Sequence, residues 1–159
     1  MESKHFRLFL CIITALVLAV CFGGAAAEPA GPSGTAARTI MLYGCGSNLE
    51  SDSGMLTFNF KQILTADIPQ EINFLVLTGG AERWETEAEY LEGAEAIGEG
   101  QHVQLWLCSG RSGANAKNGH GKMTLLDSWP AAYASASMSD EKTLQAFLTV
   151  AAEQYPAEI

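Results

Sequence analysis

The chain has 159 residues, of which 48% are hydrophobic, and its formal net charge is −9. This length is enough for one domain with a sizeable hydrophobic core. Nucleic-acid binding as the main function is excluded by the acidic balance, because phosphate recognition requires an excess of Lys and Arg. The same balance favours basic peptides as partners.

Residues 1–27 have the pattern of a secretory signal peptide. Lys4 and Arg7 precede an apolar run over residues 8–22, and three alanines at residues 25–27 form a small-residue cleavage site. The apolar run is short for a stable membrane span. We therefore expect a secreted or cell-surface protein that keeps no membrane span after signal removal.

A lipoprotein signal is the alternative interpretation of this segment. Residues 18–21 resemble a lipoprotein cleavage box in which Cys21 would be acylated, although the bulky Val20 is atypical there. Residues 28–38 are rich in Pro, Gly, Ala and Ser and predict a flexible leader.

The mature domain is organised around residues 39–52, TIMLYGCGSNLESD. The uninterrupted run from Thr39 to Tyr43 predicts a strand that is buried on both faces of a parallel sheet. Two glycines around Cys45 then permit a tight turn. This order of strand and turn predicts the opening half of a βαβ unit.

A helix is expected after the turn. Ser47, Asn48 and Ser51 offer side-chain oxygens that suit a helix N-cap, and the acids Glu50 and Asp52 suit the positive end of a helix dipole. Helical periodicity follows over residues 53–66, where the predicted core-facing residues are Leu56, Phe60, Ile63 and Leu64.

A second buried strand is predicted over residues 72–78, INFLVLT, and it also ends in glycines, Gly79 and Gly80. A helix between two buried strands favours a right-handed parallel crossover. Both glycine-rich loops then lie at one edge of the sheet. In open α/β sheets ligands bind at this edge, so we expect the substrate site there.

The remaining elements are less regular. Residues 85–99 predict short strands or an excursion of the chain away from the sheet. The side chains of residues 102–108 alternate between two unlike faces, which predicts a strand near a sheet edge or in a hairpin. Residues 123–126 are its expected partner strand. A final helix is predicted from a Ser139 cap to a stop at residues 155–156, with Leu144, Phe147, Leu148 and Ala151 as its buried stripe.

Several motifs are incomplete. The turn Gly44-Cys45-Gly46 lacks the third glycine of a dinucleotide fingerprint, because position 49 is leucine. Cys45 suits a nucleophile only with a base such as His102 or His120 beside it, and a structural role is favoured. Export permits a Cys45–Cys108 disulfide, but free cysteine is the commoner state. The acidic runs and tryptophans fit a solvated surface and core anchors better than a sugar site.

Three blocks of the sequence resemble the clostripain-like cysteine peptidases, the peptidase C11 family. They are TIMLYGCGSNLESDSG, INFLVLTGGAERW and MSDEKTLQAFLTVAAEQYPAEI, in that order, and with the segments between them they span residues 39–159. The resemblance implies a caspase-like α/β sandwich with a largely parallel sheet. It also implies a secreted endopeptidase that cleaves after Arg or Lys with a Cys–His dyad, and several members are stimulated by calcium.

The catalytic residues of that family have no counterpart here. The family His follows the strand after the Tyr-Pro-Ala helix, and the family Cys comes later still; His120, Cys45 and Cys108 match neither. The resemblance therefore implies the N-terminal part of a peptidase domain, an incomplete sandwich with an unpaired apolar sheet edge, and no cofactor within this chain. Only Ser47 and Asn48, which lie by the cleft in the family, transfer as substrate-binding candidates.

Two other functions stay open at this point. One is a non-catalytic secreted α/β binding module or inactive relative of the peptidases. The other, less favoured, is a small enzyme of another class that uses the loop of residues 44–52.

Overall fold

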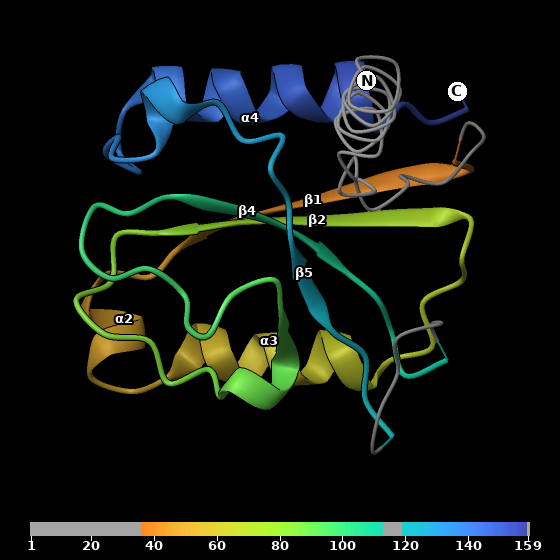
Figure 1. Ribbon diagram of the computed structural model, residues 1–159, viewed down its shortest axis with the longest axis horizontal. Helices are drawn as coiled ribbons and strands as arrows, with labels where there is room; N and C mark the ends of the chain where they lie inside the picture. Colours follow the sequence, from red (N-terminus) through yellow and green to blue (C-terminus); the bar gives the residue numbers. More distant parts are fainter. Residues whose placement is uncertain (1–35, 113–118, 159) are drawn as a thin grey trace, which may run out of the picture. The chain divides into compact units, whose positions relative to one another are not determined.

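A mixed sheet of five strands lies between helices on both of its faces (Figure 1). The computed structural model describes residues 36–112 and 119–158, which lie within one compact unit, residues 34–159. The predictions for the signal peptide and for residues 28–35 lie outside the described residues.

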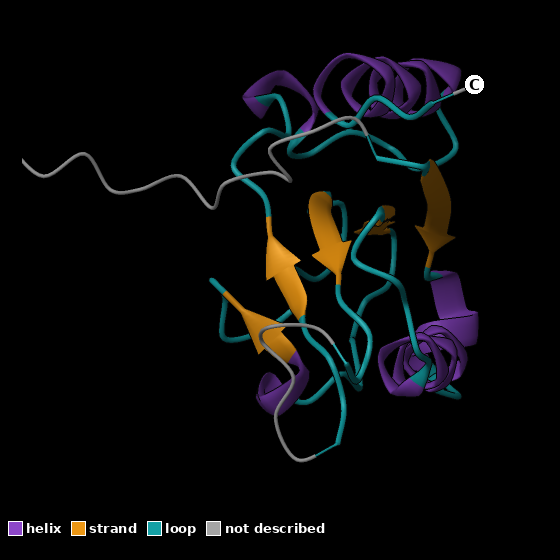
Figure 2. Ribbon diagram, turned by 90° about the vertical axis from the view of Figure 1, so that its right-hand side faces the viewer, coloured by secondary structure: helices purple, strands orange, loops and turns teal. Residues whose placement is uncertain are grey.

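The described strands and helices follow in this order: β1 (Arg38–Cys45), α2 (Ser47–Ser51), α3 (Met55–Thr65), β2 (Ile72–Gly79), η1 (Ala88–Tyr90), β3 (Leu91–Glu92), β4 (Gln104–Cys108), β5 (Met123–Leu125), η2 (Ala131–Tyr133) and α4 (Glu141–Gln154). The strand order in the sheet is β1-β2-β4-β5-β3. Helix α4 covers one face, and α2 and α3 cover the other (Figures 1 and 2).

Strands β1 and β2 are parallel neighbours, in register from Arg38 opposite Ile72 to Cys45 opposite Gly79. The predicted parallel pairing of the first two strands is therefore confirmed. The two glycine-rich ends meet as expected, because the Gly46 amide donates a hydrogen bond to the Gly79 carbonyl at 2.9 Å.

The α/β class is confirmed, but the sheet is mixed instead of largely parallel. Strand β4 runs antiparallel to β2 and to β5, whereas β3 pairs in parallel with β5. The physical reason lies in the chain between β2 and β4. It contains one 3₁₀ turn and a two-residue strand but no α-helix that could carry a parallel crossover.

Strand β4 has the two unlike faces that its alternation predicted. Leu105 packs in the cluster on the α4 side, whereas Trp106 and Cys108 pack in the cluster on the α3 side. The hairpin with β5 is also confirmed. Placement at a sheet edge is wrong, because β2 and β5 flank β4.

Strand β1 occupies the edge of the sheet. The prediction that it is buried on both faces is wrong, since Ile40 is 41% exposed and Met41 is 44% exposed. Within the described residues β2 is the single strand that pairs with β1, so its other side is open. The fold already includes the end of the segment expected to be a leader, because Ala36 is buried and forms a parallel bridge with Ala157.

Helix α3 buries the predicted stripe, with Phe60 and Leu64 almost fully enclosed. The predicted serine and asparagine caps are wrong. Gly46 caps α2 and Gly54 caps α3, and neither helix has a side-chain cap. Gly54 has φ 59°, a left-handed conformation that glycine adopts without steric cost.

The N-cap of helix α4 is one residue later than predicted. The carboxylate of Asp140, not Ser139, accepts a hydrogen bond from the Lys142 amide at 2.9 Å. Phe147 and Ala151 are buried as predicted, but Leu144 and Leu148 are 41% and 46% exposed. The buried stripe is completed by Thr143 and Val150 instead.

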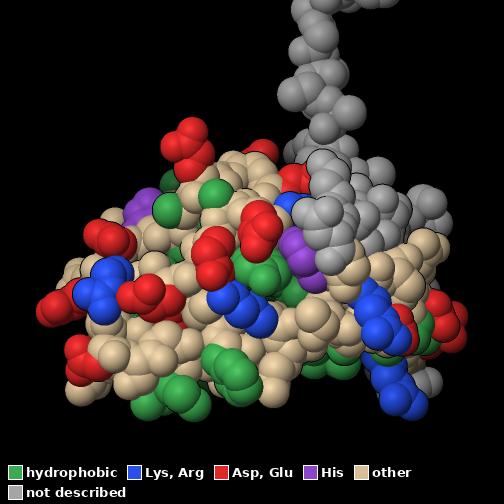
Figure 3. Space-filling view, turned by 90° about the horizontal axis from the view of Figure 1, so that it is seen from below, with side chains coloured by type: hydrophobic (Ala, Val, Ile, Leu, Met, Phe, Trp, Pro, Cys, Tyr) green, Lys and Arg blue, Asp and Glu red, His purple; other side chains and the backbone are tan. Residues whose placement is uncertain are grey.

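The outer face of α2 and α3 has a mixed surface. Acidic and basic side chains are scattered over it among other side chains and backbone, and hydrophobic side chains gather along its lower margin in Figure 3. The large exposed apolar residues of these two helices are Leu49, Met55 and Phe58.

The two described cysteines lie towards opposite ends of the sheet and are both free. Cys45 is opposite Gly79 at the end of β2, whereas Cys108 follows Leu107, which is opposite Leu75. A Cys45–Cys108 disulfide is therefore excluded, because its Cα atoms must lie within about 7 Å. Burial raises the pKa of the Cys108 thiol to about 12.

This difference predicts selective thiol labelling. At about pH 8 an alkylating reagent should modify exposed Cys45 in the native protein, while Cys108 reacts only after unfolding, because the thiolate is the nucleophile. Peptide mass mapping of the labelled protein measures both sites. Equal labelling of Cys108 under native conditions would contradict the structure.

Candidate functional site

A cavity of about 340 Å³ lies at the carboxyl ends of β1 and β2, where the sequence predicted the site. It is built from four stretches of chain that are well separated in sequence. Its lining includes Cys45, Gly80, Glu82, Gly100, Ser137 and Met138.

The floor of this cavity depends on the two glycines that end β2. Gly80 has φ 77°, and its amide donates to the Gly100 carbonyl at 3.0 Å. A Cβ atom at Gly79 would lie 3.0 Å from Met138. A side chain at Gly79 would therefore require the Met138 side chain to shift, whereas at Gly80 the constraint on a larger residue is the positive φ.

Tyr43 fixes the Met138 wall from the β1 side. Its hydroxyl donates to the Met138 carbonyl oxygen at 2.8 Å, and its ring lies against Phe147 of α4. Desolvation raises the pKa of Tyr43, and the nearby Cys45 and Asp140 raise it further. The hydroxyl therefore stays protonated and keeps donating at neutral pH.

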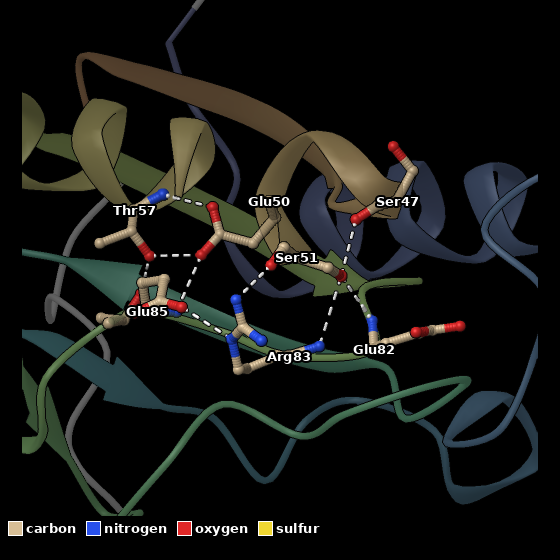
Figure 4. Close-up of polar contacts among 8 residues, drawn as sticks. Ser47, Glu50, Ser51, Thr57, Glu82, Arg83 and Glu85 are labelled. Carbon is tan, nitrogen blue, oxygen red and sulfur yellow. Dashed lines mark hydrogen bonds and ion pairs between the residues drawn. The ribbon is translucent and has the colours of Figure 1, made fainter. Parts of the chain in front are cut away.

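The buried carboxylate of Glu50 joins the segments behind this edge (Figure 4). Glu50 has no exposed surface and accepts the Thr57 amide at 2.9 Å and the Thr57 hydroxyl at 2.6 Å. It also accepts the Glu85 amide at 3.0 Å. A buried charge is tolerated when it is hydrogen-bonded in this way, and here it holds α2, α3 and the loop after β2 together.

Ser51 extends the same network towards the cavity. Its hydroxyl accepts the amide of Glu82 at 2.9 Å and donates to the Ser47 carbonyl at 3.0 Å. The Arg83 guanidinium donates to the Ser51 carbonyl at 2.6 Å (Figure 4). The main chain of Glu82 is therefore held in place.

The carboxylate of Glu82 is a charge without a protein partner. Among the described residues no hydrogen bond or ion pair engages it, whereas Glu85 and Glu87 pair with Arg83 and Lys61. Glu82 is exposed at the cavity, where its negative charge is available to a cation.

A second hollow, of about 400 Å³, lies beside the α2–α3 junction. It is lined by Asp52, Ser53, Gly54, Thr57, Phe58, Lys61, Glu85 and Glu87. Two of its acids already form ion pairs, and it does not include the end of β1 or β2. The smaller cavity is the better candidate for a site because the sheet topology places it at the end of both strands.

The two residues predicted to bind substrate lie next to this cavity in sequence, directly after Cys45 and Gly46. Ser47 and Asn48 are both exposed on α2, but neither is among the residues that line the cavity. Ser47 has φ 46°, which is uncommon for a residue with a side chain and is often found at functional sites.

The histidines are not placed to activate Cys45. His120 is buried against Tyr90, and the neighbouring Gly121 bonds Leu64 at the far end of α3. Neither His102 nor His120 lines the cavity. Among the residues that the structure describes, no imidazole and thiol therefore come together at this edge.

Two further properties concern only residues 36–112 and 119–158. Within these ranges no cluster of three or more His, Cys, Asp and Glu side chains has a geometry that could hold a metal ion. No helix in the same ranges has the length and hydropathy that a membrane crossing needs.

Comparison with known proteins does not identify a family. No family model matches the sequence, and no curated protein matches it.

Three residues important to the site were not recognised from the sequence. Glu82 was interpreted as part of a solvated acidic surface, and the contributions of Gly100 and Met138 come from distant segments.

Glu50 was expected to suit the positive end of a helix, and its bond to the Thr57 amide in the first turn of α3 fits that expectation. Its burial could not be predicted from its polarity.

We predict that Glu50→Ala destabilises the protein by about 3 kcal/mol, because it leaves the buried amide of Thr57 and the part-buried amide of Glu85 without an acceptor. Urea unfolding measures the change. Glu153→Ala, an exposed acid on α4, is the matched control and should cost less than about 0.5 kcal/mol. A similar small effect for both variants would contradict the proposed role of Glu50.

Ser47→Gly should stabilise the chain by about 1 kcal/mol, because glycine adopts a positive φ without the steric cost that a side chain carries. Asn48→Gly, one residue later in α2 at a helical φ, should destabilise it by about the same amount. Thermal or urea unfolding tests both variants. A loss of stability in Ser47→Gly would refute the strain at this position.

Proposed function

We propose that this chain is the N-terminal part of a secreted clostripain-like cysteine endopeptidase that cleaves after Arg or Lys. In this proposal the domain is a caspase-like sandwich, and residues 39–159 supply its scaffold and one wall of the substrate cleft. The sequence resemblance described above motivates the proposal, and the position and charge of the cavity support it.

The observation that carries the proposal is the unpaired Glu82 carboxylate at the cavity where β1 and β2 end. A carboxylate is the partner that a guanidinium or ammonium group requires, and a charge-assisted hydrogen bond is stronger than a neutral one. Ser51 holds the main chain of Glu82, so the residue that bears the charge is anchored beside the cavity. A basic side chain of a peptide substrate fits this arrangement.

The residues described here bind and orient in this proposal, and they do not carry out the covalent step. In a cysteine peptidase a thiolate attacks the scissile carbonyl while an imidazole transfers the proton. No residue of this chain matches either group of the family. The task that remains for these residues is to hold the basic side chain with Glu82 and to border the cleft with Ser47 and Asn48.

A non-catalytic secreted binding module is the second candidate. The specific observation in its favour is that no histidine within residues 36–112 and 119–158 lines the cavity beside the exposed thiol of Cys45. Both candidates bind basic peptides at the same place, and they differ in whether the chain belongs to a larger catalytic assembly.

Calorimetric titration with a short arginine-containing peptide amide tests the recognition step. The purified chain should bind this peptide about tenfold more tightly than the same peptide with glutamine in place of arginine, which corresponds to about 1.4 kcal/mol. Glu82→Gln should remove that preference, and Glu153→Gln should keep it, because it deletes the same charge far from the cavity.

The same purified chain should release no product from an arginine or lysine peptide substrate. Arg- or Lys-specific cleavage by this chain alone would show that its own residues are catalytic and would contradict the assignment. Equal affinity for the arginine and glutamine peptides would contradict Glu82 as the recognition group.

A further inference from the structure

Two loops that contribute to the cavity are joined at a point outside its lining. Glu82 lies in the loop after β2, whereas Gly100 and Gln101 lie in the loop before β4. The indole N–H of Trp84, in the same loop as Glu82, donates to the carbonyl oxygen of Gly98 at 3.0 Å. Trp84 is therefore a direct link between the loop that carries the charge and the loop opposite it.

Main-chain bonds join the same two loops before Glu82 in the sequence. The Gly100 amide donates to the Ala81 carbonyl oxygen at 2.6 Å, and the Gly80 amide donates to the Gly100 carbonyl oxygen at 3.0 Å. Trp84 follows Glu82, so the contacts between the loops bracket the charged residue on both sides.

The ring of Trp84 is itself held by packing. It is partly buried in the cluster on the α3 side and is stacked on Phe60 of α3, with ring centroids 6.1 Å apart. Two of its ring carbons lie 3.2 Å from the position that a Cβ atom would occupy at Gly46. The ring therefore lies against the turn at the end of β1, and its N–H is directed from a fixed position.

Each loop also has an anchor of its own. The Ser51 hydroxyl accepts the Glu82 amide at 2.9 Å, and the Gly98 amide donates to the side-chain oxygen of Gln104 on β4 at 2.6 Å. Among the described residues, the bond from Trp84 is the one side-chain hydrogen bond that runs between the two loops. A single substitution can therefore remove it without changing the main chain.

From these contacts we infer that Trp84 is a positioning residue of the cavity. Its indole N–H holds the loop that carries Glu82 and the loop that carries Gly100 at a fixed spacing. Trp84 does not line the cavity, so it acts through these two loops. A carboxylate binds a guanidinium group well only at hydrogen-bond distance and angle, so a variable spacing weakens recognition of a basic side chain. This effect on binding rests on the proposed function, whereas the spacing does not.

One substitution and a matched control isolate the indole N–H. Trp84→Phe removes the N–H and keeps an aromatic ring. Trp129→Phe makes the same change at an indole nitrogen that has no hydrogen-bond partner among the described residues and lies outside the lining of the cavity. Circular dichroism checks that both variants are folded.

NMR relaxation on the full chain tests the spacing without a ligand. The main-chain order parameters of Glu99 and Gln101 should fall from the rigid value of about 0.85 towards about 0.6 in Trp84→Phe, because the loop loses one of its links. They should stay unchanged in Trp129→Phe. A loss of global stability alone does not change these order parameters, so the measurement separates a positioning role from a merely structural one.

Binding tests the consequence for the ligand. The purified chain is titrated with the arginine-containing peptide amide and with its glutamine counterpart. Trp84→Phe should lower the tenfold preference for the arginine peptide to about threefold or less, which is the effect expected from one lost hydrogen bond. Trp129→Phe should keep the full preference.

Unchanged order parameters at Glu99 and Gln101 in folded Trp84→Phe would overturn the inference, and so would an equal loss of preference in both variants. If Trp84→Phe does not fold, the unsubstituted chain decides, because an order parameter below about 0.6 for the Trp84 indole N–H would exclude a rigid link. An unsubstituted chain with no preference for the arginine peptide would contradict the proposed function, and the order parameters would still decide the role of Trp84.

Discussion

The buried carboxylate of Glu50 is the constraint on which the geometry of the site depends. A charge with no access to water needs hydrogen-bond donors from the protein, and Glu50 obtains them from Thr57 and Glu85. These donors belong to α3 and to the loop after β2. The hydrogen bonds to this one carboxylate therefore fix two otherwise independent segments against α2. The adjacent Ser51 extends the network to Glu82, because its hydroxyl accepts the Glu82 amide.

The parallel pairing of β1 and β2 adds a second constraint. It brings two glycine-rich strand ends to one side of the sheet, where the bond between Gly46 and Gly79 closes the corner. Beside the cavity, glycine permits the close approach of Met138 at position 79 and the positive φ at position 80. The register between β1 and β2 and the absence of side chains at Gly79 and Gly80 thus together leave this space open.

Those parts of the fold that depend on local pattern were predictable from the sequence. The period of the apolar residues identified α3 and β2, and the alternation in β4 assigned Leu105 and Trp106 to opposite faces. The glycines at the ends of the two parallel strands indicated the edge of the sheet at which the cavity lies. Each of these inferences uses residues that are close together in the chain.

The parts that depend on distant segments were not predictable. An apolar run such as residues 39–43 gives no information on the number of strands that flank it. For this reason β1 was expected inside the sheet, whereas it lies at the edge. The burial of Glu50 requires donors that are 7 and 35 residues away. Likewise, Met138 reaches the cavity only because α4 folds back over β1 and β2.

The antiparallel direction of β4 relative to β2 affects where the protein can tolerate changes in sequence. The chain leaves β4 at the opposite end of the sheet from Glu82, and the segment after Cys108 is anchored there by bonds from Arg111 to Ala66 and from Gly121 to Leu64. Insertions or substitutions in that segment can accumulate without moving the walls of the cavity. Changes at that end of the sheet therefore act on folding, whereas changes at the end that carries Glu82 also act on the candidate site.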